Sequence, residues 1–119
     1  MMKIELISNV SKKEQGKLFW GTSSHDFYLD CTSNELKKVF GMYGKSDPYK
    51  VKASWYLIFL VDSDEGTKLV PITIYDYKEY DTKLTDIRDW HIGNFERDNK
   101  EVALILNWIN EKIRDGRKR

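Results

Sequence analysis

The chain has 119 residues, of which 40% are apolar, 33% are charged and 13% are aromatic. This length fits one domain, and the aromatic content argues against a disordered segment. The 20 basic and 19 acidic side chains leave a net charge of +1, without the basic excess typical of nucleic-acid binders. Cys31 is the only cysteine, so an intrachain disulfide is excluded. We therefore expect a single domain over residues 1–119 and consider nucleic acid an unfavourable partner.

The first part of the chain predicts short strands. Ile4 and Leu6 occupy alternate positions near the start, as in a strand with one buried face. Residues 17–29 predict two short strands joined by a turn at residues 21–24, because Gly and Ser favour turns. Neither the start of the chain nor its longest apolar run predicts a signal peptide or a membrane span, so we expect a cytoplasmic protein.

A short helix is predicted to follow these strands. Thr32 and Glu35 have the spacing of a capping box, in which each side chain accepts a hydrogen bond from the backbone amide of the other residue. The helix would cover residues 35–40, with its apolar side chains on one face. Gly41 would end it in a left-handed conformation.

The central part predicts a hairpin. Residues 50–62 give the clearest strand, with an acidic turn at residues 62–66 and a partner strand over residues 67–77. Because Pro71 cannot donate a backbone hydrogen bond, we expect the partner strand to lie at a sheet edge or to carry a bulge. The alternating apolar positions of the first strand are Val51, Ala53, Trp55, Leu57, Phe59 and Val61.

The last third predicts a polar loop over residues 78–89, a short strand over residues 90–92 and a long helix. This helix would start with a capping-box-like Asp98 and end before a basic, frayed tail at residues 114–119. Its apolar positions follow helical spacing: Val102, Ile105, Leu106, Ile109 and Ile113. The order of elements predicts an α+β fold, a mainly antiparallel sheet of about five strands with two helices, the C-terminal helix packed across the sheet.

Two segments concentrate aromatic and polar side chains: Ile-Tyr-Asp-Tyr-Lys at residues 74–78 and Trp-His-Ile-Gly at residues 90–93. If the two strands pair, their ends come together, and such rings and charges suit a planar, anionic, nucleotide-like ligand. The candidate ligand-binding residues are Tyr75, Asp76, Tyr77, Lys78, Trp90 and His91.

Each candidate has an expected role. Lys78 would meet an anionic group, Asp76 would accept from a hydroxyl or base edge, and Trp90 or Tyr77 would stack on the ligand. Because neighbours in a strand face opposite sides, we predict that Trp90 is buried and that His91 is available for hydrogen bonding. The structural alternative is that the aromatic residues belong to the core and the polar ones only hold the loop between the strands.

No catalytic motif accompanies these segments. The two histidines and Cys31 lack the spacing of metal ligands, and no P-loop, nucleophile elbow or dinucleotide fingerprint occurs. We therefore predict a binding protein without metal or other cofactor rather than an enzyme.

The two motifs resemble those of small proteins of tailed bacteriophages. In that set, a Phe-Gly pair, matched by Phe40-Gly41, precedes a Lys-Val…Trp strand, an Ile-Tyr-Asp-[Tyr/Trp]-Lys strand and a Trp-His-Ile-Gly-Gly segment. The resemblance covers roughly residues 17–113, and Asn94 stands where the second glycine usually follows Gly93. Asparagine tolerates a left-handed backbone, so a turn there would survive.

The resemblance implies a setting in an infected bacterial host and two hypotheses of function. In the first, the chain sequesters a nucleotide-like immune signal, as a homo-oligomer. In the second, it inhibits a host defence protein or modulates another host factor through surface aromatic residues, since Tyr and Trp are common interface anchors. The aromatic residues considered for this second role are Phe19, Trp20, Tyr28, Tyr43, Tyr49 and Tyr80.

Overall fold

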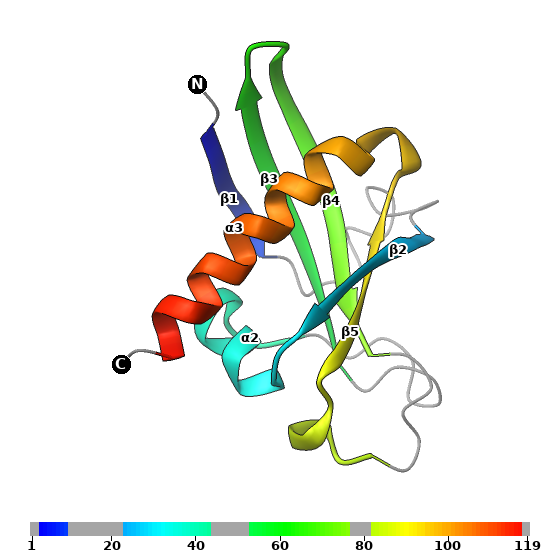
Figure 1. Ribbon diagram of the computed structural model, residues 1–119, viewed down its shortest axis with the longest axis vertical. Coiled ribbons are helices and arrows are strands. Elements are labelled where there is room, and N and C mark those ends of the chain that lie inside the picture. Colours follow the sequence, from blue (N-terminus) through cyan, green and yellow to red (C-terminus); the bar gives the residue numbers. More distant parts are fainter. Residues whose placement is uncertain (1–2, 10–22, 44–52, 77–81, 118–119) are drawn as a thin grey trace.

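The computed structural model describes residues 3–9, 23–43, 53–76 and 82–117. It is a small α+β domain with an antiparallel sheet and two helices, as the sequence predicts (Figure 1). The elements are β1 (Lys3–Asn9), β2 (Ser23–Asp30), α2 (Ser33–Phe40), β3 (Ser54–Ser63), β4 (Gly66–Tyr75), η2 (Leu84–Asp86), β5 (Asp89–Asn94), η3 (Glu96–Asp98) and α3 (Asn99–Arg117). No helix in the described ranges is long and apolar enough to cross a membrane.

The sheet has the strand order β1-β3-β4-β5-β2, and all neighbouring strands are antiparallel. Helix α3 runs diagonally across one face of this sheet, and α2 lies on the same side near the C-terminal end of α3 (Figure 1). The helices thus leave the opposite face of the sheet, here called the outer face, without a helix among the described elements.

The core lies between the sheet and α3. Alternate residues of β3, from Trp55 to Val61, are buried, and so are Val102, Ile105 and Ile109 of α3. Leu106 is only partly buried and packs at the margin of this cluster. The predicted core is therefore confirmed, because two local periodicities, one of strand type and one of helix type, bring their apolar faces together.

The predicted capping box opens α2. The Thr32 Oγ1 atom accepts from the Glu35 amide at 3.1 Å, and Glu35 Oε1 accepts from the Thr32 amide at 2.9 Å. At the other end, Gly41 has φ +83° and its amide donates to the Lys37 carbonyl at 2.8 Å. Its ψ of −161° is extended, so the glycine is needed for its positive φ but does not form the left-handed helical turn that we expected.

The β3–β4 hairpin is confirmed, but the expectation for Pro71 is wrong. β4 lies inside the sheet between β3 and β5, and its register with β3 runs without a bulge through Ile58↔Pro71. Hydrogen-bonded pairs alternate from the Ser63↔Gly66 pair at the turn, which puts Ile58↔Pro71 at a position that exchanges no hydrogen bonds. The backbone nitrogen of Pro71, which carries no hydrogen to donate, therefore points toward β5. The pairing of β5 with β4 starts only at Ile72.

The boundaries of several elements differ from the predicted ones. Ser23 and Ser24, expected in a turn, begin β2, and the first strand expected before that turn lies outside the described residues. Asp98 does not cap α3; it is the last residue of η3 and is fully buried. Helix α3 continues through Arg117, so the expected tail is helical as far as that residue.

Candidate functional site

The two segments singled out in the sequence lie side by side. β4 and β5 pair antiparallel with the register Ile74↔Ile92 and Tyr75↔His91. The predicted adjacency is therefore confirmed for these residues. Tyr77 and Lys78, the other two members of the first segment, lie outside the described residues.

Two of the candidate residues are part of the fold. Trp90 is fully buried, and its Nε1 donates to the Cys31 carbonyl at 2.9 Å. Its ring packs edge-to-face with the ring of Trp55, with centroids 5.4 Å apart. Asp76 is also fully buried, and its Oδ1 accepts from the Ala53 amide at 2.9 Å. The prediction that Trp90 is the buried member of its pair is confirmed, and both side chains hold neighbouring strands in place.

Tyr75 and His91 lie on the outer face, together with Tyr28 of β2. The register places the three in one row across β4, β5 and β2. The Tyr75 ring stacks on His91 with centroids 5.5 Å apart and planes inclined by 21°, and Tyr28 meets His91 edge-on at 5.1 Å and 66°. Tyr75 and His91 are half-buried, whereas Tyr28 is 54% exposed. We call these three rings the aromatic row.

Sequence reasoning missed Tyr28 as a member of this site and considered it only as an interface residue. β2 and β5 are about 60 residues apart in sequence (Tyr28 and His91), and nothing local indicates that they pair. The one usable signal was alternation, since Leu29 is buried and Tyr28 must therefore face the other side.

Away from the aromatic row, the outer face carries apolar side chains. On β3 and β4 the pairs are Ile58↔Pro71 and Leu60↔Leu69. Leu69 is 59% exposed, and the other three are half-buried. The outer face thus combines one polar and aromatic end with an apolar strip.

Gly93 lies next to the aromatic row at a position where a side chain would collide with its neighbours. A Cβ atom at this position would lie 2.3 Å from Thr73 Oγ1 and 3.5 Å from Cε1 of Tyr75. Thr73 is the cross-strand partner of Gly93, and its hydroxyl donates to the Gly93 carbonyl at 3.4 Å. The glycine of the second motif therefore serves close packing of β5 against β4.

We predict that Gly93→Ala lowers the free energy of unfolding by about 1–3 kcal/mol, the usual cost of overpacking a closely packed site. In a Thr73→Ala background the new methyl group no longer meets the hydroxyl, so the same substitution should cost clearly less. Urea unfolding of the two single variants and the double variant measures this coupling. An equal cost in both backgrounds would contradict the contact.

Asn94 does not form the left-handed turn that the resemblance suggested. It is the last residue of β5, paired with both Ile72 and Ser23, and it is fully buried. Its Nδ2 donates to the Phe95 carbonyl and to Asn99 Oδ1, each at 2.8 Å. Asparagine at this position therefore ties the end of β5 to the start of α3.

The described residues give little indication of thiol reactivity or metal binding. Burial raises the pKa of the Cys31 thiol to about 12, which keeps it protonated and unreactive. Within the described ranges, no three His, Cys, Asp or Glu side chains gather where they could hold a metal ion. Comparison of the chain with known protein families, curated protein sequences and solved structures gave no match.

Proposed function

We propose that this chain is a binding protein that holds a planar, nucleotide-like small molecule against the aromatic row. The observation that carries the proposal is the convergence of Tyr75, His91 and Tyr28 from three strands, with Tyr28 more than half exposed. Aromatic side chains on an open sheet face are a common platform for stacking bases.

The residues of the aromatic row would have different roles in binding this ligand. Tyr28 offers its ring for stacking, and His91, held between the two tyrosines, offers a polar edge beside it. A net charge of +1 suits a small ligand better than a polyanion, because binding to nucleic acid depends on neutralising many phosphates.

The resemblance to tailed-bacteriophage proteins supplies a role for such binding. A phage protein that sequesters a host's nucleotide signal would suppress an immune response without catalysing a reaction. The second candidate is a protein–protein inhibitor, which the exposure of Tyr28 and Leu69 on the same face favours.

Calorimetry against a panel of cyclic and ADP-ribose-derived nucleotides tests the proposal. We expect a member of the panel to bind, and Tyr28→Ala to weaken it about 5- to 100-fold, as the loss of one stacking ring does. Tyr28→Phe should retain most of the affinity because it keeps the ring. Leu69→Ala, a similarly exposed side chain away from the row, is the matched control and should not change it.

The absence of binding at micromolar concentrations across the panel would contradict the proposal. A pull-down from bacterial lysate separates the two candidates. Stoichiometric capture of a protein that Tyr28→Ala and Leu69→Ala both weaken would favour the inhibitor. A nucleotide released when the purified protein is denatured would favour the small-molecule ligand.

A further inference from the structure

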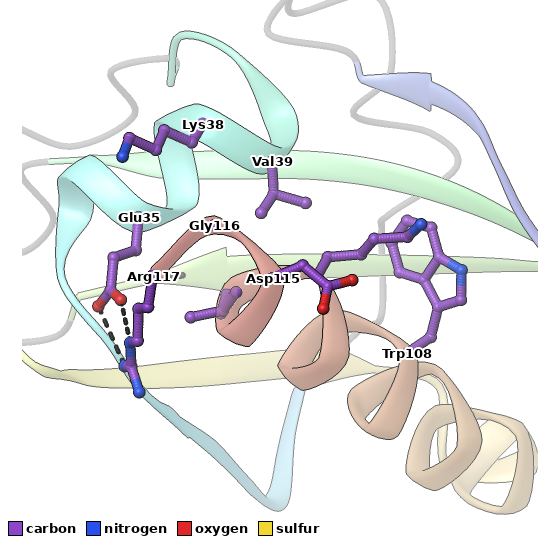
Figure 2. Close-up of a pocket in the computed structure, with 9 residues that line it drawn as sticks. Glu35, Lys38, Val39, Trp108, Asp115, Gly116 and Arg117 are labelled. Atoms are coloured by element: carbon purple, nitrogen blue, oxygen red, sulfur yellow. Dashed lines mark hydrogen bonds and ion pairs between the residues drawn. The ribbon is translucent and has the colours of Figure 1, made fainter. Parts of the chain in front are cut away.

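A groove lies between α2 and the C-terminal half of α3, on the side of the sheet that carries the helices (Figure 2). Its volume is about 770 Å³, within the usual range for small-molecule sites. The lining residues are Glu35, Lys38, Val39, Trp108, Lys112, Ile113, Asp115, Gly116 and Arg117. We call this the α2–α3 groove; it shares no residue with the aromatic row.

The inner wall of the groove is apolar. Val39 of α2 and Trp108 of α3 both line it (Figure 2), together with Ile113 of α3, which is buried. One side of the Trp108 indole is fixed by an edge contact with Phe59 of the core, with centroids 5.4 Å apart. A ligand entering the groove would therefore meet a preformed apolar surface.

An ion pair closes one end of the groove. Arg117 donates to both carboxylate oxygens of Glu35, as the dashed lines in Figure 2 show. The Arg117 guanidinium, helped by the Thr32 amide, lowers the pKa of Glu35 to about 2. The Glu35 charge is thus already compensated, and this pair fixes the end of α3 against α2.

The remaining charges on the rim favour an anion. They are the ammonium groups of Lys38 and Lys112 and the carboxylate of Asp115. Lys112 lies over the Trp108 ring, 5.3 Å from its centroid. Among the described residues, neither ammonium group has a carboxylate within ion-pair distance. Two cations against one anion leave the rim one positive charge in excess.

We propose that the α2–α3 groove binds a small monoanionic amphiphile, a molecule with an apolar chain or ring and one acidic group. The apolar part lies against Val39, Trp108 and Ile113, where its burial supplies most of the affinity. The acidic group meets Lys38 or Lys112 at the rim, which supplies selectivity for charge. This site is independent of the proposed nucleotide site.

Calorimetry with decanoate at premicellar concentrations tests the proposal, with decanol and decylammonium as neutral and cationic analogues of the same chain length. We expect decanoate to bind at one site per chain and both analogues to bind at least fivefold more weakly. Of the two variants Lys38→Gln and Lys112→Gln, the one that removes the lysine in contact with the acid should weaken decanoate about fivefold. The matched controls are Lys37→Gln on α2 and Arg114→Gln on α3, which remove the same charge outside the groove and should leave the affinity unchanged.

Three results would overturn the proposal. The first is no saturable binding of decanoate at millimolar concentrations. The second is equal binding of decanol, or equal losses in the control variants, because the acid would then not be recognised by Lys38 and Lys112. The third is a dimer in sedimentation that Lys112→Gln dissociates and decanoate does not, since the groove would then be covered by a second copy of the chain.

Discussion

Replacing Ile105 with alanine is expected to lower the free energy of unfolding by about 2–5 kcal/mol, the usual cost of a large-to-small change in a core. Ile105 is fully buried in the cluster that contains Trp55 and Ile92. It lies in the N-terminal half of α3, which crosses the sheet diagonally (Figure 1). A shortened side chain would leave a cavity there, because a helix held at both ends cannot move inward to fill it.

Chemical denaturation of purified protein measures this loss. Asn107→Ala is the matched control, since this side chain is exposed on the same helix and its truncation removes no core contact. It should leave the midpoint nearly unchanged. A loss below about half a kcal/mol for Ile105→Ala would contradict the packing of α3 on the sheet.

The core could be predicted from the sequence because each contributing element carries its own periodicity. Trp55, Leu57 and Phe59 alternate in β3 whatever lies beside them, and Val102 and Ile109 repeat with the pitch of α3. The capping box at Thr32 is equally local and is found as predicted. Local patterns define an element and its buried face without reference to the rest of the chain.

Neighbours within the sheet could not be predicted in the same way. Pro71 suggested an edge strand, but whether a strand lies at an edge depends on every other strand. A proline is accepted inside this sheet because its neighbour β5 is short and pairs with β4 only from Ile72 onward. Its position reflects the length of β5, which local propensity at Pro71 does not encode.

In the candidate site, too, some contacts could be predicted from the sequence and others could not. The pairing of Tyr75 with His91 follows from two strands joined by a single connection, so it could be predicted. Tyr28 enters the aromatic row through the β2–β5 pairing, which joins distant parts of the chain. The burial of Asp76 was not expected either, because it depends on the hydrogen bond from Ala53.

Asp98 is the clearest case of a role set by tertiary contacts. Its carboxylate is only 1% exposed, and the Lys68 ammonium of β4 lies 2.7 Å from its Oδ1. Lys68 also reaches Glu101 Oε1 at 3.0 Å, and its pKa is raised mainly by its contact with the Asp98 carboxylate. The residue that the sequence indicated as a helix cap is therefore the buried half of an ion pair that ties α3 to the sheet.

Lys68→Met is expected to lower the free energy of unfolding by about 3 kcal/mol, because it leaves the buried Asp98 carboxylate without its cation. We place the loss at the lower end of the range for broken buried pairs for two reasons. The Lys68 side chain is 39% exposed, and Arg97 Nε lies 3.9 Å from the same oxygen. Removing both charges in Lys68→Met with Asp98→Asn should recover much of the loss.

The matched control is Lys100→Met, which breaks the pair with Glu65. The Lys100 Nζ and Glu65 Oε1 atoms lie 2.8 Å apart, but both side chains are more than 70% exposed. No measurable loss is therefore expected. Equal effects of the two lysine substitutions at neutral pH, or a double variant no more stable than Lys68→Met, would show that burial of Asp98 does not determine the strength of this contact.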